Sequence, residues 1–196
     1  MGEVTVPARL CSQNEHKRAE LARVLQGWRL ELLDAETYPP EKGATFLDNA
    51  RAKARFGRDV GPEDEWMLGE DSGLELAALD GRPGVESARW AGGRHVERVL
   101  AALAGEADRS ARYVCELVAL SPDGLELRAT GTLEGAIALA ARGGGGFGFD
   151  PVFVPDREER TVAELGDAWK AEHSHRARAA LALLESLAAS KPDIAD

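Results

Sequence analysis

The stretch ARYVCELVALSPDGLELRATGTLEGAIAL, residues 111–139, decides the fold. Its first ten residues, 111–120, alternate between apolar and polar side chains, which is the pattern of a half-buried strand. The Ser-Pro-Asp-Gly segment at 121–124 is typical of a tight turn, and a second extended segment follows it. We therefore predict a long antiparallel hairpin.

Further strands and helices are expected before the hairpin. The apolar run ARLCS at 8–12 precedes a polar turn and a helical pattern, and RLELL at 29–33 is a candidate second strand. Two prolines and a glycine indicate a loop at 38–44. Thr45 and Asp48 then form the start signature of another helix.

Residues 66–79, WMLGEDSGLELAAL, contain two apolar runs separated by Glu-Asp-Ser-Gly, so we expect a strand, an acidic turn and a second strand. The other expected elements are a Gly/Pro-rich loop at 80–93, a helix at 94–105, a glycine-rich segment at 142–155, a short helix at 161–165 and an Ala/Leu-rich helix at 174–190. This order predicts an α/β fold with a mixed sheet rather than a simple βα repeat.

Length and composition limit the class of protein. A chain of 196 residues, 44% hydrophobic and 30% charged, is expected to form one globular domain over 1–196, or two small lobes that share a core. Cys11 and Cys115 lie far apart and form no cysteine or histidine cluster, which excludes a disulfide scaffold and a zinc finger and fits a reducing cytoplasm.

The charge balance limits the partners. A formal net charge of −10 disfavours general binding to nucleic acid, although a few converging donors can still hold a small anion. The N-terminal stretch MGEVTVPARL has neither the basic flank nor the apolar run of a signal peptide. We therefore expect neither secretion nor insertion into a membrane.

The first candidate site is SQNEHK at 12–17, between a predicted strand and a predicted helix. A helix N-terminus offers unpaired N–H groups and a positive dipole end to phosphate oxygens. Ser12 and Asn14 add donors, and Lys17 adds a point charge one turn into the helix. An ordinary helix cap with a solvated lysine remains the alternative.

The second candidate is the acidic pair Glu70 and Asp71. Adjacent carboxylates repel each other unless a cation lies beside them, and Mg²⁺ binds one or two carboxylates together with water and phosphate oxygens. The alternative is an acidic surface turn closed by Gly73.

Two further candidates lie in the last third of the chain. Glycines at 143–146 precede Phe-Gly-Phe-Asp at 147–150, where an aromatic ring can stack on a base and Asp150 can accept from a ring N–H. Lys170 and Arg176 are candidate donors to an anion or a carbonyl. A flexible loop and a helix cap are the alternatives for these two segments.

Six ordered motifs together resemble one known family. They are Ser-x-Asn-x-x-Lys at 12–17, Thr-Phe-x-x-Asn-Ala-x-x-Lys-Ala at 45–54, Asp-Ser-Gly-Leu at 71–74, Pro-Gly-x-x-Ser-Ala-Arg at 83–89, Gly-Gly-Phe-Gly-Phe-Asp-Pro at 145–151 and Lys-x-x-x-Ser-His-Arg at 170–176. In this order, over about residues 8–188, they resemble the inosine triphosphate pyrophosphatase family, the XTP/dITP diphosphatases.

The resemblance implies a fold, an activity and a set of functional residues. It implies two lobes around a long mixed sheet with substrate in the cleft between them, a homodimer, and Mg²⁺-dependent hydrolysis of ITP, dITP and XTP to the monophosphate and pyrophosphate. The resemblance implies that Asp71 is the general base and a metal ligand, and that Glu41 and Glu70 are further metal ligands. It also implies that Lys17 stabilises the leaving pyrophosphate. The implied substrate-binding residues are Ser12, Gln13, Asn14, Glu15, His16, Lys17, Lys53, Ser72, Phe147, Gly148, Phe149, Asp150, Lys170, His175 and Arg176.

Two positions depart from the family pattern, and two other functions remain open. Glu70 stands where the family has Asp, and Asp48 stands where it has Glu, so the charge is kept but the reach of the carboxylate differs.

The rival functions are a pyrophosphatase for pyrimidine triphosphates, which would not need the Ser-His-Arg segment, and a nucleotide-binding regulator without turnover, which would not need Asp71.

Overall fold

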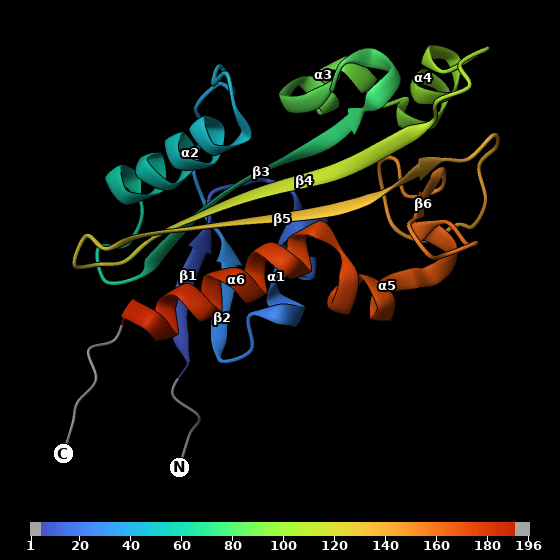
Figure 1. The fold of residues 1–196 in the computed structure, drawn as a ribbon. Helices are drawn as coiled ribbons and strands as arrows, with labels where there is room; N and C mark the ends of the chain where they lie inside the picture. Colours follow the sequence, from blue (N-terminus) through green and yellow to red (C-terminus); the bar gives the residue numbers. More distant parts are fainter. Residues whose placement is uncertain (1–4, 191–196) are drawn as a thin grey trace.

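A computed structural model describes residues 5–190 of the chain. A six-stranded mixed sheet in the order β2-β1-β3-β4-β5-β6 forms its centre, with helices on both faces (Figure 1). The strands are β1 (Val6–Leu10), β2 (Trp28–Leu32), β3 (Trp66–Leu76), β4 (Ser110–Leu120), β5 (Glu126–Ile137) and β6 (Phe153–Pro155). The α/β class with a mixed sheet, predicted from the order of elements, is confirmed.

The sheet is parallel on one side and antiparallel on the other. β1 runs parallel to both β2 and β3, whereas β3, β4, β5 and β6 pair antiparallel in succession. The predicted hairpin is confirmed: β4 and β5 pair from Ser110↔Ala136 to Leu120↔Glu126. These long strands connect two ends of the molecule, each of which carries its own hydrophobic clusters.

The predicted break in the segment 66–79 is wrong. β3 is one continuous strand of 11 residues, and Glu70 to Gly73 lie inside it, paired with Leu117 to Val114 of β4. Successive strand residues point to opposite faces of a sheet, so Glu70 and Asp71 do not face each other. Lys17 pairs with Glu70 on one face, and Lys53 pairs with Asp71 on the other. Side chains of the protein therefore supply the positive charge that was expected beside these two acids.

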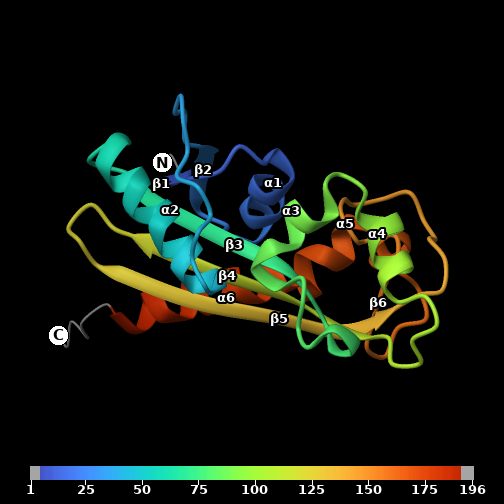
Figure 2. The ribbon, with the colours of Figure 1, turned by 90° about the horizontal axis from the view of Figure 1, so that it is seen from above.

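Helices cover both faces of the sheet. They are α1 (Glu15–Val24), α2 (Phe46–Val60), α3 (Ser87–Ala91), α4 (His95–Ala102), α5 (Val162–His173) and α6 (His175–Ser190), with 3₁₀ turns η1 (Ala77–Leu79) and η2 (Gly84–Glu86). α2 packs on β3 and β4 from one face, and α1 and α6 pack on the other (Figures 1 and 2). No helix within residues 5–190 combines the length and the apolar character that crossing a membrane requires.

Two glycines allow helices to approach the sheet closely. A Cβ at Gly69 would lie 1.9 Å from the carbonyl oxygen of Ala50 in α2, and one at Gly131 would lie 2.0 Å from that of His175 in α6. Both neighbours are backbone atoms, which cannot rotate away. α2 and the start of α6 therefore sit directly against the central strands, and this positions their polar side chains.

The remaining elements surround the far end of the sheet. α3, α4, α5 and β6 gather there around a cluster that includes Leu76, Val99 and Phe153 (Figure 2). The segment 80–93 contains η2 and α3 in addition to the expected loop. The helix expected at 161–165 continues past a kink at Gly166 (φ 81°) and ends at His173.

Candidate active site

The N-terminus of α1 opens onto a cavity of about 1280 Å³. Asn14 caps the helix, because its side chain accepts hydrogen bonds from His16 N at 3.0 Å and Lys17 N at 3.2 Å. Ser12 Oγ accepts from Asn14 N at 3.1 Å. The positive end of α1 therefore faces this space, while the N–H groups of His16 and Lys17 are occupied by the cap.

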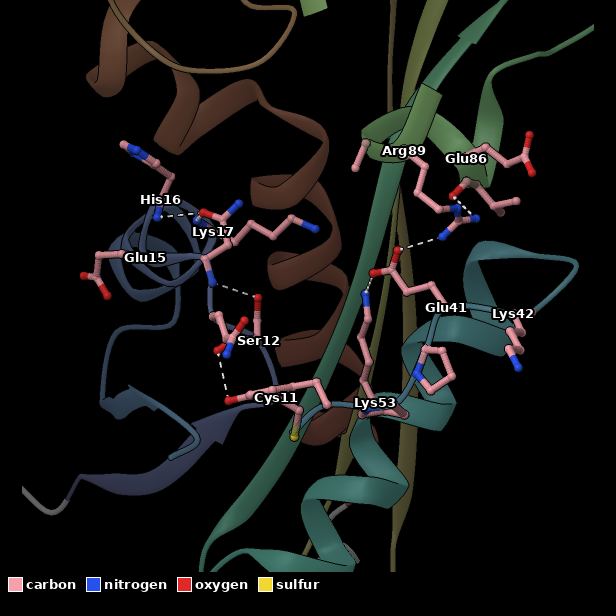
Figure 3. Close-up of a pocket in the computed structure, with 18 residues that line it drawn as sticks. Cys11, Ser12, Glu15, His16, Lys17, Glu41, Lys42, Lys53, Glu86 and Arg89 are labelled. Carbon is pink, nitrogen blue, oxygen red and sulfur yellow. Dashed lines mark hydrogen bonds and ion pairs between the residues drawn. The ribbon is translucent and has the colours of Figure 1, made fainter. Parts of the chain in front are cut away.

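Three other parts of the chain complete this cavity. They are the proline-containing loop at 38–43, Lys53 of α2, and residues Val85, Glu86, Ala88 and Arg89 of η2 and α3 (Figure 3). All six residues of the segment 12–17 also line it. Glu15, however, is exposed and is paired with Arg18 rather than turned inward.

Glu70 lies on the face of β3 that α1 and α6 cover. Its side chain is fully buried; Lys17 Nζ lies 2.6 Å from Oε2, and Arg176 Nε donates to Oε1 at 2.9 Å. Burial alone would raise the pKa of Glu70, but Lys17, Arg176 and Lys53 outweigh it and hold the pKa well below its ordinary value. Glu70 is thus an ionised residue with a cation on each oxygen.

Asp71 lies on the opposite face of β3, under α2. Lys53 Nζ donates to Asp71 Oδ1 at 2.9 Å, and Asn49 Nδ2 donates to Oδ2 at 3.0 Å. Burial raises the pKa of Asp71 above its ordinary value, although Lys53 and Asn49 oppose this. Asp71 is therefore a stronger base than a solvated aspartate.

Glu41 shares the cation that binds Asp71. Lys53 Nζ lies 2.5 Å from Glu41 Oε1, and Arg89 Nη1 lies 3.3 Å from Glu41 Oε2. Two carboxylates from distant segments, the loop at 38–44 and β3, therefore converge on one positive charge. Within residues 5–190, no group of three or more His, Cys, Asp or Glu side chains forms a metal-binding cluster.

A second cavity, of about 250 Å³, adjoins the first. Asn14, Lys17 and Ala88 line both cavities. The other lining residues come from β3, β4, α3, α4, the segment 147–150 and the start of α6: Ser72, Gly73, Ser87, His95, Tyr113, Phe147, Gly148, Phe149, Asp150, His175 and Arg176.

A chain of ionic contacts runs through the wall of this second cavity. Lys170 contacts both Asp150 Oδ2, at 2.8 Å, and Glu20. Arg176 Nη1 donates to Glu20 Oε2 at 3.0 Å, and its Nη2 donates to Ser72 Oγ at 2.7 Å. The structure thus joins residues predicted from three separate motifs, with Glu20 as the bridge between the two cations.

Aromatic rings line the same cavity. The Phe147 ring lies 5.1 Å from the His16 ring, with Lys170 Nζ 4.8 Å from its centroid. His175 is buried, its ring stacks on Tyr113 at 4.6 Å, and its Nδ1 has no hydrogen-bond partner among the described residues. Burial, together with Arg176, lowers the pKa of His175 well below its ordinary value, so the ring is neutral.

The prediction from sequence missed three polar residues of the site. Glu20 and Asn49 bind predicted site residues directly, and Tyr113 OH donates to Asp150 Oδ1 at 3.2 Å. Glu20 lies three positions after Lys17 in α1, so the two share a helix face, and this spacing was the signal available for it. Nothing in the alternation of β4 distinguishes Tyr113 from a core residue.

Comparisons with known proteins agree with one another. The Ham1 family model matches residues 8–186. The chain is 41% identical to the dITP/XTP pyrophosphatase of Gloeobacter violaceus, with 89% of this chain and 91% of that protein covered. It is 43% identical to the dITP/XTP pyrophosphatase of Thermus thermophilus, with 90% and 89% covered.

Solved structures show the same likeness. The Staphylococcus aureus Ham1 protein matches with a TM-score of 0.81 and 30% identity, and the match covers 94% of this chain and 100% of that one. A Ham1 protein from Coxiella burnetii matches with a TM-score of 0.80 and 34% identity, covering 95% and 100%.

Proposed function

The chain belongs to the Ham1 family, and on that premise we propose that it hydrolyses ITP, dITP and XTP to the nucleoside monophosphate and pyrophosphate. The relatives named dITP/XTP pyrophosphatase support the substrate class. The observation that carries the proposal is the arrangement of two adjoining cavities at the N-terminus of α1. One is lined by that helix end and by basic side chains, and the other by aromatic rings together with Asp150 and Arg176.

The residues present fit Mg²⁺. Glu41 and Asp71 already converge on the positive charge of Lys53, and Mg²⁺ binds one or two carboxylates while phosphate and water fill its other positions. These two side chains would hold it. When bound, it would neutralise phosphate charge and acidify a coordinated water.

Glu70 suits a different role from the metal ligand that the family pattern implies. Its carboxylate lies on the opposite face of β3 from the Glu41–Asp71 pair, and there its two oxygens bind Lys17 and Arg176. In this proposal Glu70 positions those two cations, one at each cavity.

The chain's own residues supply the rest of the chemistry. Asp71, with its raised pKa, takes a proton from the attacking water. The bond that breaks joins the α-phosphorus to the oxygen that bridges it to the β-phosphate, and pyrophosphate leaves. Lys17, held by Glu70 at the N-terminus of α1, stabilises the charge that develops on the leaving group.

The second cavity is suited to hypoxanthine and xanthine. These bases carry a carbonyl at C6 and a proton on N1, whereas adenine carries an amino group at C6 and no proton on N1. Arg176 can only donate, and an ionised Asp150 can only accept. Together they complement the C6 carbonyl and the N1–H of hypoxanthine and xanthine, but not the C6 amino group and bare N1 of adenine. Phe147 supplies a ring on which the base can stack.

The family resemblance also supports a homodimer in the cytoplasm. Cys11 and Cys115 are both buried and free, which fits a reducing compartment. Light scattering after size exclusion tests the dimer, because a mass near twice 21.0 kDa is expected.

A panel of substrates tests the proposed function. The protein is incubated with Mg²⁺ and ITP, dITP, XTP, GTP, ATP or dUTP, and pyrophosphate is assayed separately from phosphate. ITP, dITP and XTP are expected to give pyrophosphate and monophosphate in equal amounts. Preference for a pyrimidine would favour the first rival, and binding without turnover would favour a regulatory module.

A further inference from the structure

Tyr113 lines the second cavity but has no role in the function proposed above. It lies on β4, it is buried, and it belongs to the hydrophobic cluster at the far end of the sheet. A phenylalanine would fill the same space without a hydroxyl group. Because a buried hydroxyl that lacks a partner costs free energy, the partner of this hydroxyl indicates what the tyrosine does.

The hydroxyl of Tyr113 contacts Asp150. Tyr113 OH donates to Asp150 Oδ1 at 3.2 Å, and both residues are buried. Burial, together with the neighbouring carboxylate of Asp150, raises the pKa of Tyr113 well above its ordinary value. The hydroxyl therefore keeps its proton at neutral pH and remains a donor to Asp150.

The ring of Tyr113 fixes the direction from which this hydroxyl approaches. It stacks on the Phe153 ring with the centroids 4.3 Å apart, and on the His175 ring at 4.6 Å. Phe153 belongs to β6 and His175 begins α6, so three elements hold the tyrosine in place. The hydroxyl lies at the end of the ring axis and cannot move away from Asp150 unless both stacking contacts shift.

Three donors already occupy the carboxylate of Asp150. An ionised carboxylate offers about four acceptor positions, two on each oxygen. Asp150 Oδ2 accepts from Lys170 Nζ at 2.8 Å and from Phe147 N at 2.9 Å. Among the described residues, Oδ1 accepts only from Tyr113. The acceptor position that remains for a ligand is therefore on Oδ1, next to the tyrosine hydroxyl.

We infer that Tyr113 is a positioning residue for base selection, whose hydroxyl holds Asp150 so that the remaining acceptor position of Oδ1 meets the N1–H of hypoxanthine or xanthine. This inference rests on the proposed function, since it assumes that the second cavity holds the base. Adenine has no proton on N1 and gains nothing from that acceptor. Loss of the hydroxyl should therefore impair the use of ITP and XTP and spare that of ATP.

Tyr113→Phe tests this inference, because it removes the hydroxyl and keeps the ring with its stacking contacts. The measurement is kcat and KM on ITP, XTP and ATP with Mg²⁺. For ITP and XTP, kcat/KM should fall by about fivefold or more, mainly through a higher KM, while for ATP it should stay within about twofold of wild type. The kcat for ITP should change little, since Asp71 and Lys17 remain in place.

A double-variant cycle tests whether the hydroxyl acts through Asp150. The same measurements are made on Asp150→Ala, with and without Tyr113→Phe. Lys170 keeps Glu20 as a partner in these variants. Without the carboxylate the hydroxyl has nothing to position, so Tyr113→Phe should change the ITP-to-ATP ratio of kcat/KM by less than about twofold in this background. A further fivefold fall in the ratio would overturn the inference.

Tyr38→Phe is the matched control. Tyr38 is the other tyrosine of the chain, and its hydroxyl contacts the backbone carbonyls of Ser12 and Leu33 at the larger cavity, so any effect should fall equally on all three substrates. If Tyr113→Phe left the ITP-to-ATP ratio within about twofold of wild type, or lowered kcat/KM equally on both, the positioning role would be overturned and the proposed function would stand. A wild type that releases no pyrophosphate from ITP or XTP would overturn the proposed function itself.

Discussion

Lys17 Nζ lies 2.6 Å from Glu70 Oε2, and the Glu70 side chain is 0% exposed. The pair joins the first turn of α1 to the middle of β3, so the helix end that faces the larger cavity is fastened to the strand that carries Asp71. Arg176 on the other oxygen of Glu70 extends the connection to the second cavity. One buried acid thus sets the relative positions of the groups proposed to bind phosphate and base.

Lys17→Ala is expected to weaken binding of ITP by about tenfold or more, and binding of IMP much less, because the charge it meets lies on the leaving group. Affinities are measured in the Asp71→Asn background so that substrate is not consumed. Glu70 keeps Arg176 as a partner, so the variant should still fold. Equal losses of affinity for ITP and IMP would instead place Lys17 beside the purine ring or the ribose, which both ligands share.

Arg176→Ala should lower kcat/KM for ITP and XTP far more than for ATP, because the donor at C6 is lost. A site whose buried donors and acceptors are left unpaired by the wrong base can discriminate against that base by as much as about 10⁴-fold. The measurement is kcat/KM on ITP, XTP, GTP and ATP. Arg176→Lys is the matched control, since it keeps a charge for Glu20 and Glu70. A uniform drop on all four substrates would show that base reading lies elsewhere.

His175 should make the protein less stable in acid. Because burial depresses its pKa in the folded state, the unfolded chain binds more protons below the ordinary value of 6.5. Stability from this residue is therefore complete above that value and is lost as pH falls, by at most about 1.4 kcal/mol per pH unit. Urea unfolding at successive pH values should show a shallower loss for His175→Asn than for wild type or for the exposed control His173→Asn. Identical slopes would count against a buried neutral ring.

Gly69→Ala should destabilise the fold by at least about 2 kcal/mol, because its Cβ would lie 1.9 Å from Ala50 O in α2. Gly144→Ala is the control, since no heavy atom lies within 4 Å of a Cβ built there. Chemical denaturation measures both. Equal stability of the two variants would mean that α2 does not pack this closely on β3.

Local patterns predicted most of the fold. The β4–β5 hairpin follows from alternation and one turn signal, and α2 begins where Thr45 and Asp48 form the expected capping box. The error at Glu70 to Gly73 has a physical cause: two acids followed by Ser and Gly are typical of a turn. Only cations from other elements allow those acids to lie inside a strand, and a local pattern does not contain them.

The candidate site was also predictable only in part, because local patterns do not show contacts between distant elements. Asn49 and Lys53 are four positions apart on α2, so their shared face could be read from the sequence, but the strand residue they meet, Asp71, could not. Glu20 reaches Arg176 across 156 positions. Such contacts depend on how the helices pack on the sheet, which the glycines Gly69 and Gly131 control.

Turnover by Asp71→Asn tests the central claim most directly. The substitution keeps the size of the side chain and one of its two acceptor oxygens but removes the charge proposed to take the proton, so kcat for ITP with saturating Mg²⁺ should fall by about 10²–10⁴-fold. The variant should remain folded and should still bind ITP when Mg²⁺ is omitted, and Asp64→Asn, at an exposed position, should keep full activity. Retention of more than about a tenth of wild-type kcat would contradict the assignment of Asp71 as the base, and with it the mechanism proposed for this site.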